Sequence, residues 1–170
     1  MILECGCPGE FPAEWDKKDV DLGDYCIHRL PVPMLVHMPL AFEVYVQRQQ
    51  RMIDGLGLRE RWPGLVLTRT GMLRGSITRL LEDAQSLSRH VRTLPSPYHV
   101  RALLHHGNVS TIRPALRELQ MSLLDGGRMP KELYLCHLTC PRCSARRGGD
   151  QILLLRHWQP SAMLEKRRRA

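Results

Sequence analysis

Apolar residues recur at helical spacing in the second quarter of the chain. Over positions 40–56 they fall on one face of a helix that would begin after Pro39 and end at Gly55 and Gly57. The residues on this face are Leu40, Phe42, Val44, Tyr45, Val46, Met52, Ile53 and Leu56. The pattern therefore predicts a helix over 40–56.

Three further segments show the same spacing. An apolar stripe over 72–91 predicts a second helix, and the segment 97–106, which follows a Pro-rich break, predicts a third. Ser110 or Thr111 would cap a fourth helix that runs up to a Gly-Gly pair. This helix tolerates Pro114 in its first turn, because the first amides of a helix have no intrahelical partner.

Two short apolar runs near the C-terminus are instead typical of strands. Leu133-Tyr134-Leu135 leads into the segment from Cys136 to Cys143, and Gln151 to Leu155 follows a Gly-Gly turn. These runs predict a short β-hairpin that carries a metal-binding knuckle.

The composition favours helices for the rest of the core. Aromatic residues make up only 5% of the chain, so the core must consist of Leu, Val, Ile and Met, as in packed helices. A chain of 170 residues with 43% hydrophobic content is long enough for one such core. We therefore predict a mainly α fold, with a helical core of about four helices and a small Cys-rich, metal-bound subdomain that joins the N- and C-terminal segments.

This interpretation divides the chain into four parts. Residues 1–39 form a Cys-, Pro- and Gly-rich segment that contributes metal ligands, and residues 40–130 form the helical core. Residues 131–158 form the metal knuckle and hairpin, and residues 159–170 form a basic tail.

The cysteines indicate a metal site. The chain has neither the pattern of a secretory signal nor an apolar run of about 18 residues that would span a membrane, so we expect a cytoplasmic protein. In a reducing compartment its six cysteines are better explained as metal ligands than as disulfides.

The strongest motif is Cys140-Pro141-Arg142-Cys143, because two thiolates at this spacing can bind one tetrahedral ion. The best second half of the site is Cys5-Gly6-Cys7, which has no β-branched residue between its thiols. We therefore predict that zinc, bound by Cys5, Cys7, Cys140 and Cys143, joins the two ends of the chain.

Other ligand sets remain open. Cys26, His28 and Cys136 either replace members of this set or form a second site, although a buried cysteine also serves as a small hydrophobic residue. An iron-sulfur cluster is the alternative cofactor, because cysteine ligation alone does not select the ion. A redox-active Cys-x-x-Cys pair is a further rival, but no βαβ pattern surrounds it.

The charge favours an anionic partner. The formal net charge of +8 is typical of proteins that bind nucleic acid, an anionic membrane face or an acidic protein. Part of the excess lies in Lys166 to Arg169, where a basic tail is often simply solvated.

The segment 97–125 resembles the helix-turn-helix of bacterial regulators, with a Gly-Asn turn between its two predicted helices. In that geometry the second helix lies in the major groove of DNA. The resemblance implies that the DNA contacts come from Ser110, Thr111, Arg113 and Arg117. An ordinary helical hairpin gives the same pattern, and Pro114 departs from the usual recognition helix.

Three functions follow from these observations. The leading hypothesis is a zinc-stabilised, helical nucleic-acid-binding or transcription-regulatory protein. The alternative is a metal-containing accessory or adaptor protein that docks a larger enzyme or assembly, and the second alternative is a zinc or thiol-redox enzyme. The chain has no Walker loop, dinucleotide fingerprint, metalloprotease motif or nucleophile elbow, so the sequence argues against an enzyme and assigns no catalytic residue.

Overall fold

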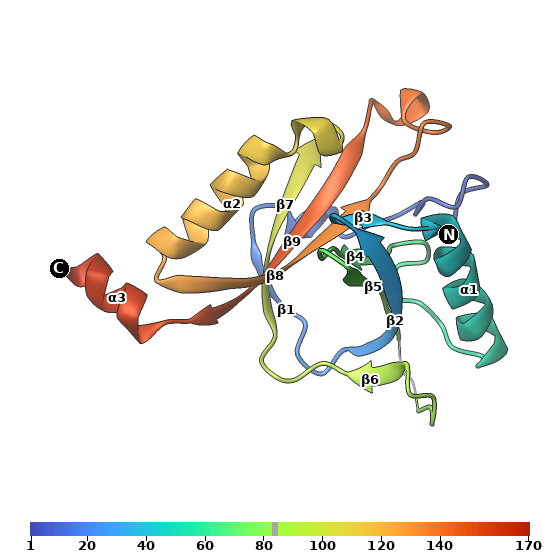
Figure 1. The fold of residues 1–170 in the computed structure, drawn as a ribbon, viewed down its shortest axis with the longest axis horizontal. Helices are drawn as coiled ribbons and strands as arrows, with labels where there is room; N and C mark the ends of the chain where they lie inside the picture. The colour runs from blue at the N-terminus through green and yellow to red at the C-terminus, as the bar shows by residue number, and fades with distance from the viewer. Residues whose placement is uncertain (83–84) are drawn as a thin grey trace.

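The computed structural model describes residues 1–82 and 85–170 and centres on a nine-stranded antiparallel sheet (Figure 1). This sheet corrects the predicted mainly α fold, because the described part of the chain has three α-helices and no four-helix core. The strands are β1 Asp19–Asp21, β2 Cys26–Leu35, β3 Met38–Pro39, β4 Leu67–Arg69, β5 Arg74–Leu80, β6 Val91–Thr93, β7 His99–His106, β8 Arg128–His137 and β9 Gln151–Pro160. The helices are α1 Phe42–Gly55, α2 Arg113–Asp125 and α3 Ala162–Arg169, and the short 3-10 turns are Ala13–Trp15, Val109–Thr111 and Ala145–Arg147.

Two β-α-β-β units build the sheet. The first unit contains β2, α1, β4 and β5, and the second contains β7, α2, β8 and β9. In the strand order β1-β7-β9-β8-β4-β5-β2-β3 the units lie on either side of the β4–β8 pair. There Thr68 faces Leu135 and Arg69 faces Tyr134. The units are thus related by an approximate twofold axis at this pair, although the sequence shows no repeat of fixed period.

Helices α1 and α2 cover one side of the sheet, which we call the helix face. Under α2, Leu119 packs with Leu103 and Leu154, and under α1 the residues Leu30 and Ile77 form a second cluster. Each Leu or Ile buried in this way stabilises the fold by about 1.5–3 kcal/mol.

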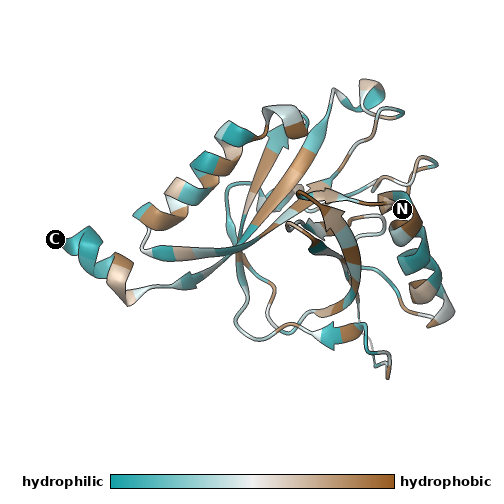
Figure 2. Cartoon of the chain, in the orientation of Figure 1, coloured by the Kyte–Doolittle hydropathy of each residue, from teal (hydrophilic) through white to brown (hydrophobic). Residues whose placement is uncertain are grey.

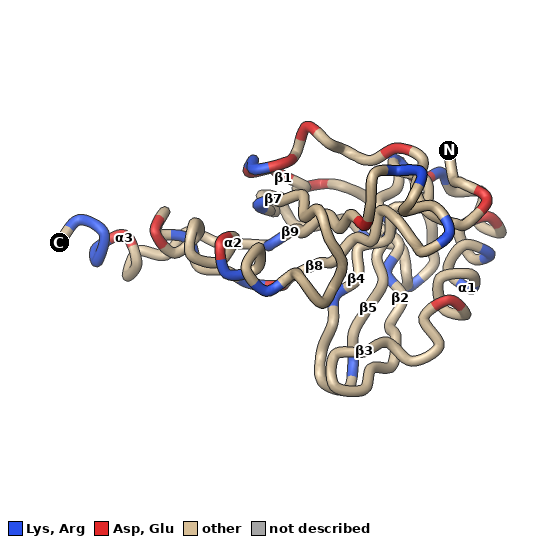
Figure 3. The backbone as a smooth tube through the Cα atoms, turned by 90° about the horizontal axis from the view of Figure 1, so that it is seen from above, with Lys and Arg blue, Asp and Glu red and all other residues tan. Residues whose placement is uncertain are grey.

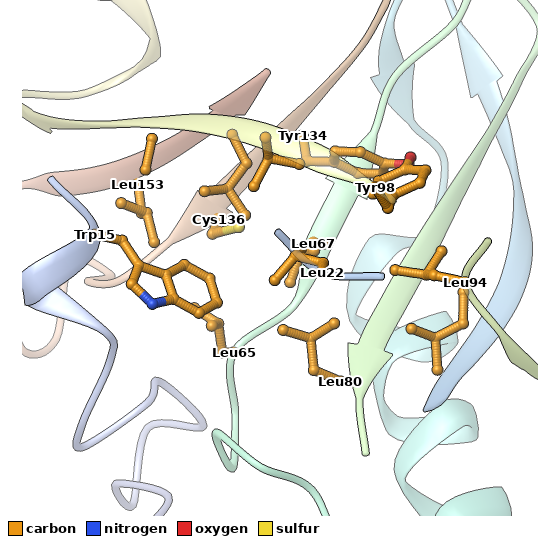
Figure 4. Close-up of a cluster of buried hydrophobic side chains, with 14 of the residues drawn as sticks. Trp15, Leu22, Leu65, Leu67, Leu80, Leu94, Tyr98, Tyr134, Cys136 and Leu153 are labelled. Carbon is orange, nitrogen blue, oxygen red and sulfur yellow. The ribbon is translucent and has the colours of Figure 1, made fainter. Parts of the chain in front are cut away.

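The opposite side, which we call the far face, is covered by the N-terminal segment and by the loop before β7 (Figure 4). Trp15, Leu22, Leu94 and Tyr98 come from these covering segments and pack onto the sheet. The sheet residues beneath them are Ile27, Leu67, Leu80, Val100, Ala102, Tyr134, Cys136, Leu153 and Leu155. The hydropathy colouring agrees with two covered faces, because the central strands contain long apolar stretches while α3 is largely hydrophilic (Figure 2).

Two of the predicted helices are strands. Within the predicted helix 72–91, Arg74–Leu80 form strand β5 and Val91 begins strand β6, and positions 83 and 84 lie outside the described residues. Six consecutive residues of β5, Gly75 to Leu80, are buried, because both faces of the sheet are covered. A strand covered on both faces lacks the polar and apolar alternation that would distinguish it from a helix.

The same error affects the segment 97–106, which is strand β7. The predicted helix-turn-helix over 97–125 is therefore a strand, a 3-10 turn and helix α2. Leu103 and Leu104 are neighbours on opposite faces of the sheet, each in an apolar cluster, and such neighbouring apolar residues hid the strand.

Prolines hid the long strand β2. The segment 1–39 reads as irregular, yet β2 pairs with β5 through Pro31 and Pro33. The amide of Arg29 bonds the carbonyl of His90 on one side of β2, and the amide of Met34 bonds Leu73 on the other. Odd-numbered positions thus direct their amides away from β5, and proline is tolerated there because it has no amide to pair.

Three elements lie where the sequence predicts them. Helix α1 falls within 40–56. Helix α2 forms the predicted fourth helix, but Ile112 is at its N-cap position, so the predicted cap at Ser110 or Thr111 is wrong. The hairpin of β8 and β9 surrounds the Cys136 to Cys143 segment, with Cys136 opposite Leu153.

A buried polar network fixes α1 to the sheet. Arg79 of β5 forms an ion pair with Glu60, with Nη1 and Oε2 2.7 Å apart and both side chains at most 4% exposed. Gln49 of α1 accepts a hydrogen bond from Arg79 Nε at 3.2 Å and donates to the carbonyls of His28 and Ile77. Removing one member of a buried ion pair leaves the other charge unpaired, which costs more than the pair itself contributes.

We expect Glu60→Gln to lower the free energy of unfolding by about 3 kcal/mol, because the buried Arg79 charge loses its partner. Urea denaturation measures this change. Glu43→Gln, at an exposed position at the start of α1, is the matched control and should leave the midpoint unchanged. Equal midpoints for both variants would show that the ion pair contributes no stability.

Candidate functional site

Four cysteines from the two ends of the chain lie together. Cys5 and Cys7 are in the N-terminal loop, and Cys140 and Cys143 are in the turn between β8 and β9, with all four Sγ atoms within 4.8 Å of one another. The Sγ atoms of Cys140 and Cys143 are 3.9 Å apart. A tetrahedral zinc ion with Zn–S bonds of about 2.3 Å separates its sulfurs by about 3.8 Å, so the four thiols can hold a metal ion of this size.

Backbone turns shape both halves of this cysteine cluster. In the first half the amide of Leu3 bonds the carbonyl of Cys7 at 2.9 Å, and Gly6 between the thiols has φ +86°, which favours glycine. In the second half the amide of Cys143 bonds the carbonyl of Cys140 at 3.0 Å. The Arg147 guanidinium joins the halves by donating to the carbonyls of Pro8 and Leu138, both at 2.8 Å.

The same turns favour a thiolate at one ligand. Burial acts to raise the pKa of the Cys140 thiol, but hydrogen bonds from the backbone amides of Arg142 and Cys143, together with those from the thiols of Cys7 and Cys5, lower the pKa to about 7. Burial, followed by the neighbouring thiols, raises the pKa of Cys7. Because a bound cation favours thiolates, metal binding at this cluster would release protons.

The other three predicted ligands lie elsewhere. Cys136 is fully buried in the far-face core, and burial raises the pKa of its thiol. His28 lies under α1 with Nδ1 3.1 Å from Gln49 Nε2, and burial, together with the charges of His90 and Arg79, lowers its pKa to about 4. The Sγ of Cys26 is 3.9 Å from Thr93 Oγ1.

The four residues predicted to contact DNA lie at and before the start of α2. The amide of Ser110 donates to Asn108 Oδ1 at 2.9 Å, and Thr111 Oγ1 is 3.0 Å from His105 Nε2. Arg113 and Arg117 are exposed and lie about one turn apart on α2. Their role in DNA binding stays a prediction.

A second candidate site, which sequence reasoning missed, is a cavity of about 220 Å³ on the far face. Its lining comes from the end of β6, from the residues between β6 and β7, and from strands β2, β4, β8 and β9. Its lining residues are Arg29, Arg69, Arg92, Thr93, Leu94, Pro95, Tyr98, Glu132, Tyr134 and His157. We call this cavity the far-face pocket.

A histidine and a carboxylate form the polar centre of the far-face pocket. His157 Nδ1 lies 2.7 Å from Glu132 Oε2. Burial acts to raise the pKa of Glu132, but the hydrogen bond from His157 and the positive charge of Arg69 contribute to a net lowering. An ionised carboxylate only accepts hydrogen bonds, so Nδ1 carries the proton in this bond, which leaves Nε2 as the nitrogen that can accept a proton.

Two tyrosines complete this centre. The ring of Tyr98 stacks on the imidazole of His157 with centroids 4.0 Å apart and an interplanar angle of 6°. The hydroxyls of Tyr98 and Tyr134 are 2.7 Å apart, and Arg29 Nη2 donates to Tyr134 at 3.5 Å (Figure 4). Burial and the neighbouring Tyr134 raise the pKa of Tyr98, so its hydroxyl stays protonated and able to donate. An oriented base beside hydroxyl donors is suited to general acid and base catalysis.

Solved structures with this fold include two of the protein EcmrR. The chain matches a cryo-EM structure of the EcmrR–DNA complex with a TM-score of 0.58 and 11% identity over 84% of its own length. It matches the crystal structure of the EcmrR C-terminal domain with a TM-score of 0.57 and 11% identity, again over 84% of its length. It covers 56% of the EcmrR chain in the complex but 96% of the C-terminal domain, so the shared fold is that of this domain.

None of the described helices is long and apolar enough to cross a membrane.

Comparison of the sequence with known proteins gives a match to one family model. No curated protein matches the chain. The model of the family described as Bacterial hydrolase matches residues 3–157, which include both the cysteine cluster and the far-face pocket. The chain belongs to the Bacterial hydrolase family.

Proposed function

We propose that this protein is a hydrolase of small molecules and that the far-face pocket is its active site. The observation that carries the proposal is the 2.7 Å bond between His157 and Glu132, which lies in a cavity beside the paired hydroxyls of Tyr98 and Tyr134. The match to the Bacterial hydrolase family supports the proposal, because the matched residues 3–157 include every residue that lines the pocket.

The roles follow from the geometry. Nε2 of His157 takes a proton from water as the water oxygen bonds the carbonyl carbon of a small ester. The carbonyl electron pair moves to oxygen, where the hydroxyl pair of Tyr98 and Tyr134 donates a hydrogen bond to the oxyanion. The C=O bond then reforms, the ester C–O bond breaks, and the imidazolium of His157 returns its proton to the leaving alkoxide. Glu132 stabilises that imidazolium and orients the ring.

We expect His157→Gln and Glu132→Gln each to lower kcat/KM for 4-nitrophenyl acetate by about 100-fold or more, because a positioned general base typically contributes 10²–10⁴-fold. Release of 4-nitrophenolate measures the rate. His106→Gln and Glu118→Gln, both at exposed positions outside the pocket, are the controls and should retain the wild-type rate. If the wild type is no faster than His157→Gln, the assignment of the active site is wrong.

We also propose that the ion in the cysteine cluster is zinc and that it stabilises the fold. Four thiolates close a tetrahedral site, which is the arrangement of structural zinc, whereas a catalytic zinc keeps a position for water. A multi-iron cluster is larger than one ion and would need the four sulfurs further apart than the 4.8 Å limit observed. A cytoplasmic location, which we propose as well, would keep these thiols reduced.

Protein purified without added metal should contain about one zinc per chain, and Cys5→Ser and Cys140→Ser should each lose the metal and unfold at lower temperature. Elemental analysis and thermal unfolding measure the two effects. Cys26→Ser is the matched control and should keep the metal, because Cys26 lies away from the cluster. Iron in place of zinc, or full stability without metal, would contradict the proposal.

Binding of nucleic acid in transcription regulation is a second candidate function. Two observations favour it: the structural similarity to EcmrR in its complex with DNA, and the concentration of Lys and Arg on α3 (Figure 3). The contacts we propose are Ser110, Thr111, Arg113 and Arg117, which lie together at the start of α2. These residues would bind phosphates as an exposed basic patch, not as a recognition helix.

Arg113→Ala combined with Arg117→Ala should weaken binding to duplex DNA and reduce the slope of log affinity against log salt by about two, one for each lost phosphate contact. Fluorescence anisotropy at several salt concentrations measures the slope. Arg48→Ala combined with Arg51→Ala, on the exposed side of α1, is the control. The same loss in both double variants would show that charge alone, and not this surface, binds DNA.

A further inference from the structure

We propose that the far-face pocket binds a small organic anion and that Arg69 and Arg29 hold its charged group. This inference rests on the proposed active site, because it assigns the class of substrate that this site takes. The charged group is a carboxylate or an oxyanion of similar size, such as a phosphate.

The first argument is the charge of the pocket lining. Three arginines, Arg29, Arg69 and Arg92, line it together with one carboxylate, Glu132, which already bonds His157. Among the ion pairs of the described residues, none includes any of these three arginines. Arg29 and Arg69 are half-buried, and cations withdrawn from water generally have an anionic partner. The pocket therefore lacks negative charge that a ligand would supply.

The second argument is a pair of unused donors. In the described part of the chain, Arg69 Nε and Ser76 Oγ are buried without a hydrogen-bond partner. The two residues face each other across the β4–β5 pair, and Ser76 is only 3% exposed. Leaving a buried donor unpaired costs about 1–3 kcal/mol. Of the two residues only Arg69 lines the pocket, so its guanidinium is the group that a bound anion would pair.

The third argument is position. Arg69 and Ser76 alternate along β4 and β5 with Thr68 and Ile77, which lie on the helix-face side, so they lie on the far face. Arg69 also faces Tyr134 across the β4–β8 pair. The Tyr134 hydroxyl accepts from Arg29 and pairs with Tyr98, which stacks on His157. An anion bound by these donors would thus have its reactive bond close to the proposed base.

The cavity limits the size of the substrate. Its volume of about 220 Å³ is below the roughly 300–1,000 Å³ of pockets that enclose drug-sized ligands. The substrate is therefore a compact anion, in which the charged group and the bond that breaks are separated by a few bonds.

Benzoate and benzamide test the anion site without any reaction, because they have nearly the same shape and differ in charge. By calorimetric titration, benzoate should bind the wild type at least about tenfold more tightly than benzamide, since hydrogen bonds to a charged group contribute about 1.5–3 kcal/mol. Arg69→Gln should weaken benzoate binding by about tenfold without affecting benzamide. Arg48→Gln, on the exposed side of α1, is the control and should have no effect.

Thermal unfolding of each variant confirms that it remains folded. Equal binding of benzoate and benzamide, or equal effects of Arg69→Gln and Arg48→Gln on benzoate, would overturn the proposal.

A kinetic comparison separates this proposal from the hydrolase proposal. The substrates 4-acetoxybenzoate and 4-nitrophenyl acetate have similar shapes, but only the first is an anion. The ratio of their kcat/KM values should fall about tenfold in Arg69→Gln relative to the wild type, and the difference in leaving group cancels in this comparison.

The hydrolase proposal and the anion-site proposal can each fail while the other holds. If hydrolysis depends on His157 but the ratio of the two kcat/KM values is unchanged in Arg69→Gln, the hydrolase proposal holds and the anion-site proposal is wrong. If benzoate binds selectively but no ester is hydrolysed, the anion-site proposal holds and the hydrolase proposal is wrong.

Discussion

The short antiparallel pair between β4 and β8 is the contact on which this structure depends. It joins the two β-α-β-β units into one sheet and places Arg69 of the first unit opposite Tyr134 of the second. The far-face pocket exists only because of this junction, since its lining comes from both units. On the helix face, the cysteine cluster approaches the same junction, because Cys5, Cys7 and Cys140 border a cavity of about 280 Å³ together with Thr68 of β4 and residues of α1.

The N-terminal loop strengthens the junction from outside the sheet. Pro8 packs against Gly64, just before β4, so closely that a Cβ on Gly64 would lie 3.1 Å from Pro8 Cα, and Gly64 also has φ +84°. Arg147, beyond Cys143, donates to the carbonyl of Pro8. The proposed metal would therefore connect a turn of the second unit to a loop that rests on the first unit, which explains why we expect its loss to affect the stability of the whole fold.

The sequence predicts local features of this protein better than its sheet. Helices α1 and α2 have one exposed face, so their periodicity is visible, and the β8–β9 hairpin has its own turn signals. The proximity of Cys5, Cys7, Cys140 and Cys143 could be proposed from thiol spacing alone. Strand β5 could not be identified, because it is buried on both faces, and the far-face pocket was missed because its residues are scattered from Arg29 to His157. Only knowledge of the strand register would have placed them on one surface.

The origin of the pocket residues in two units separates recognition from chemistry. The donors proposed to bind the anion, Arg29 and Arg69, both come from the first unit. The proposed base, His157, and the carboxylate that orients it, Glu132, come from the second. Substitutions in one half can therefore change which molecule is accepted while the reacting groups in the other half remain in place. A fold divided in this way allows related proteins to diverge in substrate without rebuilding their catalytic machinery.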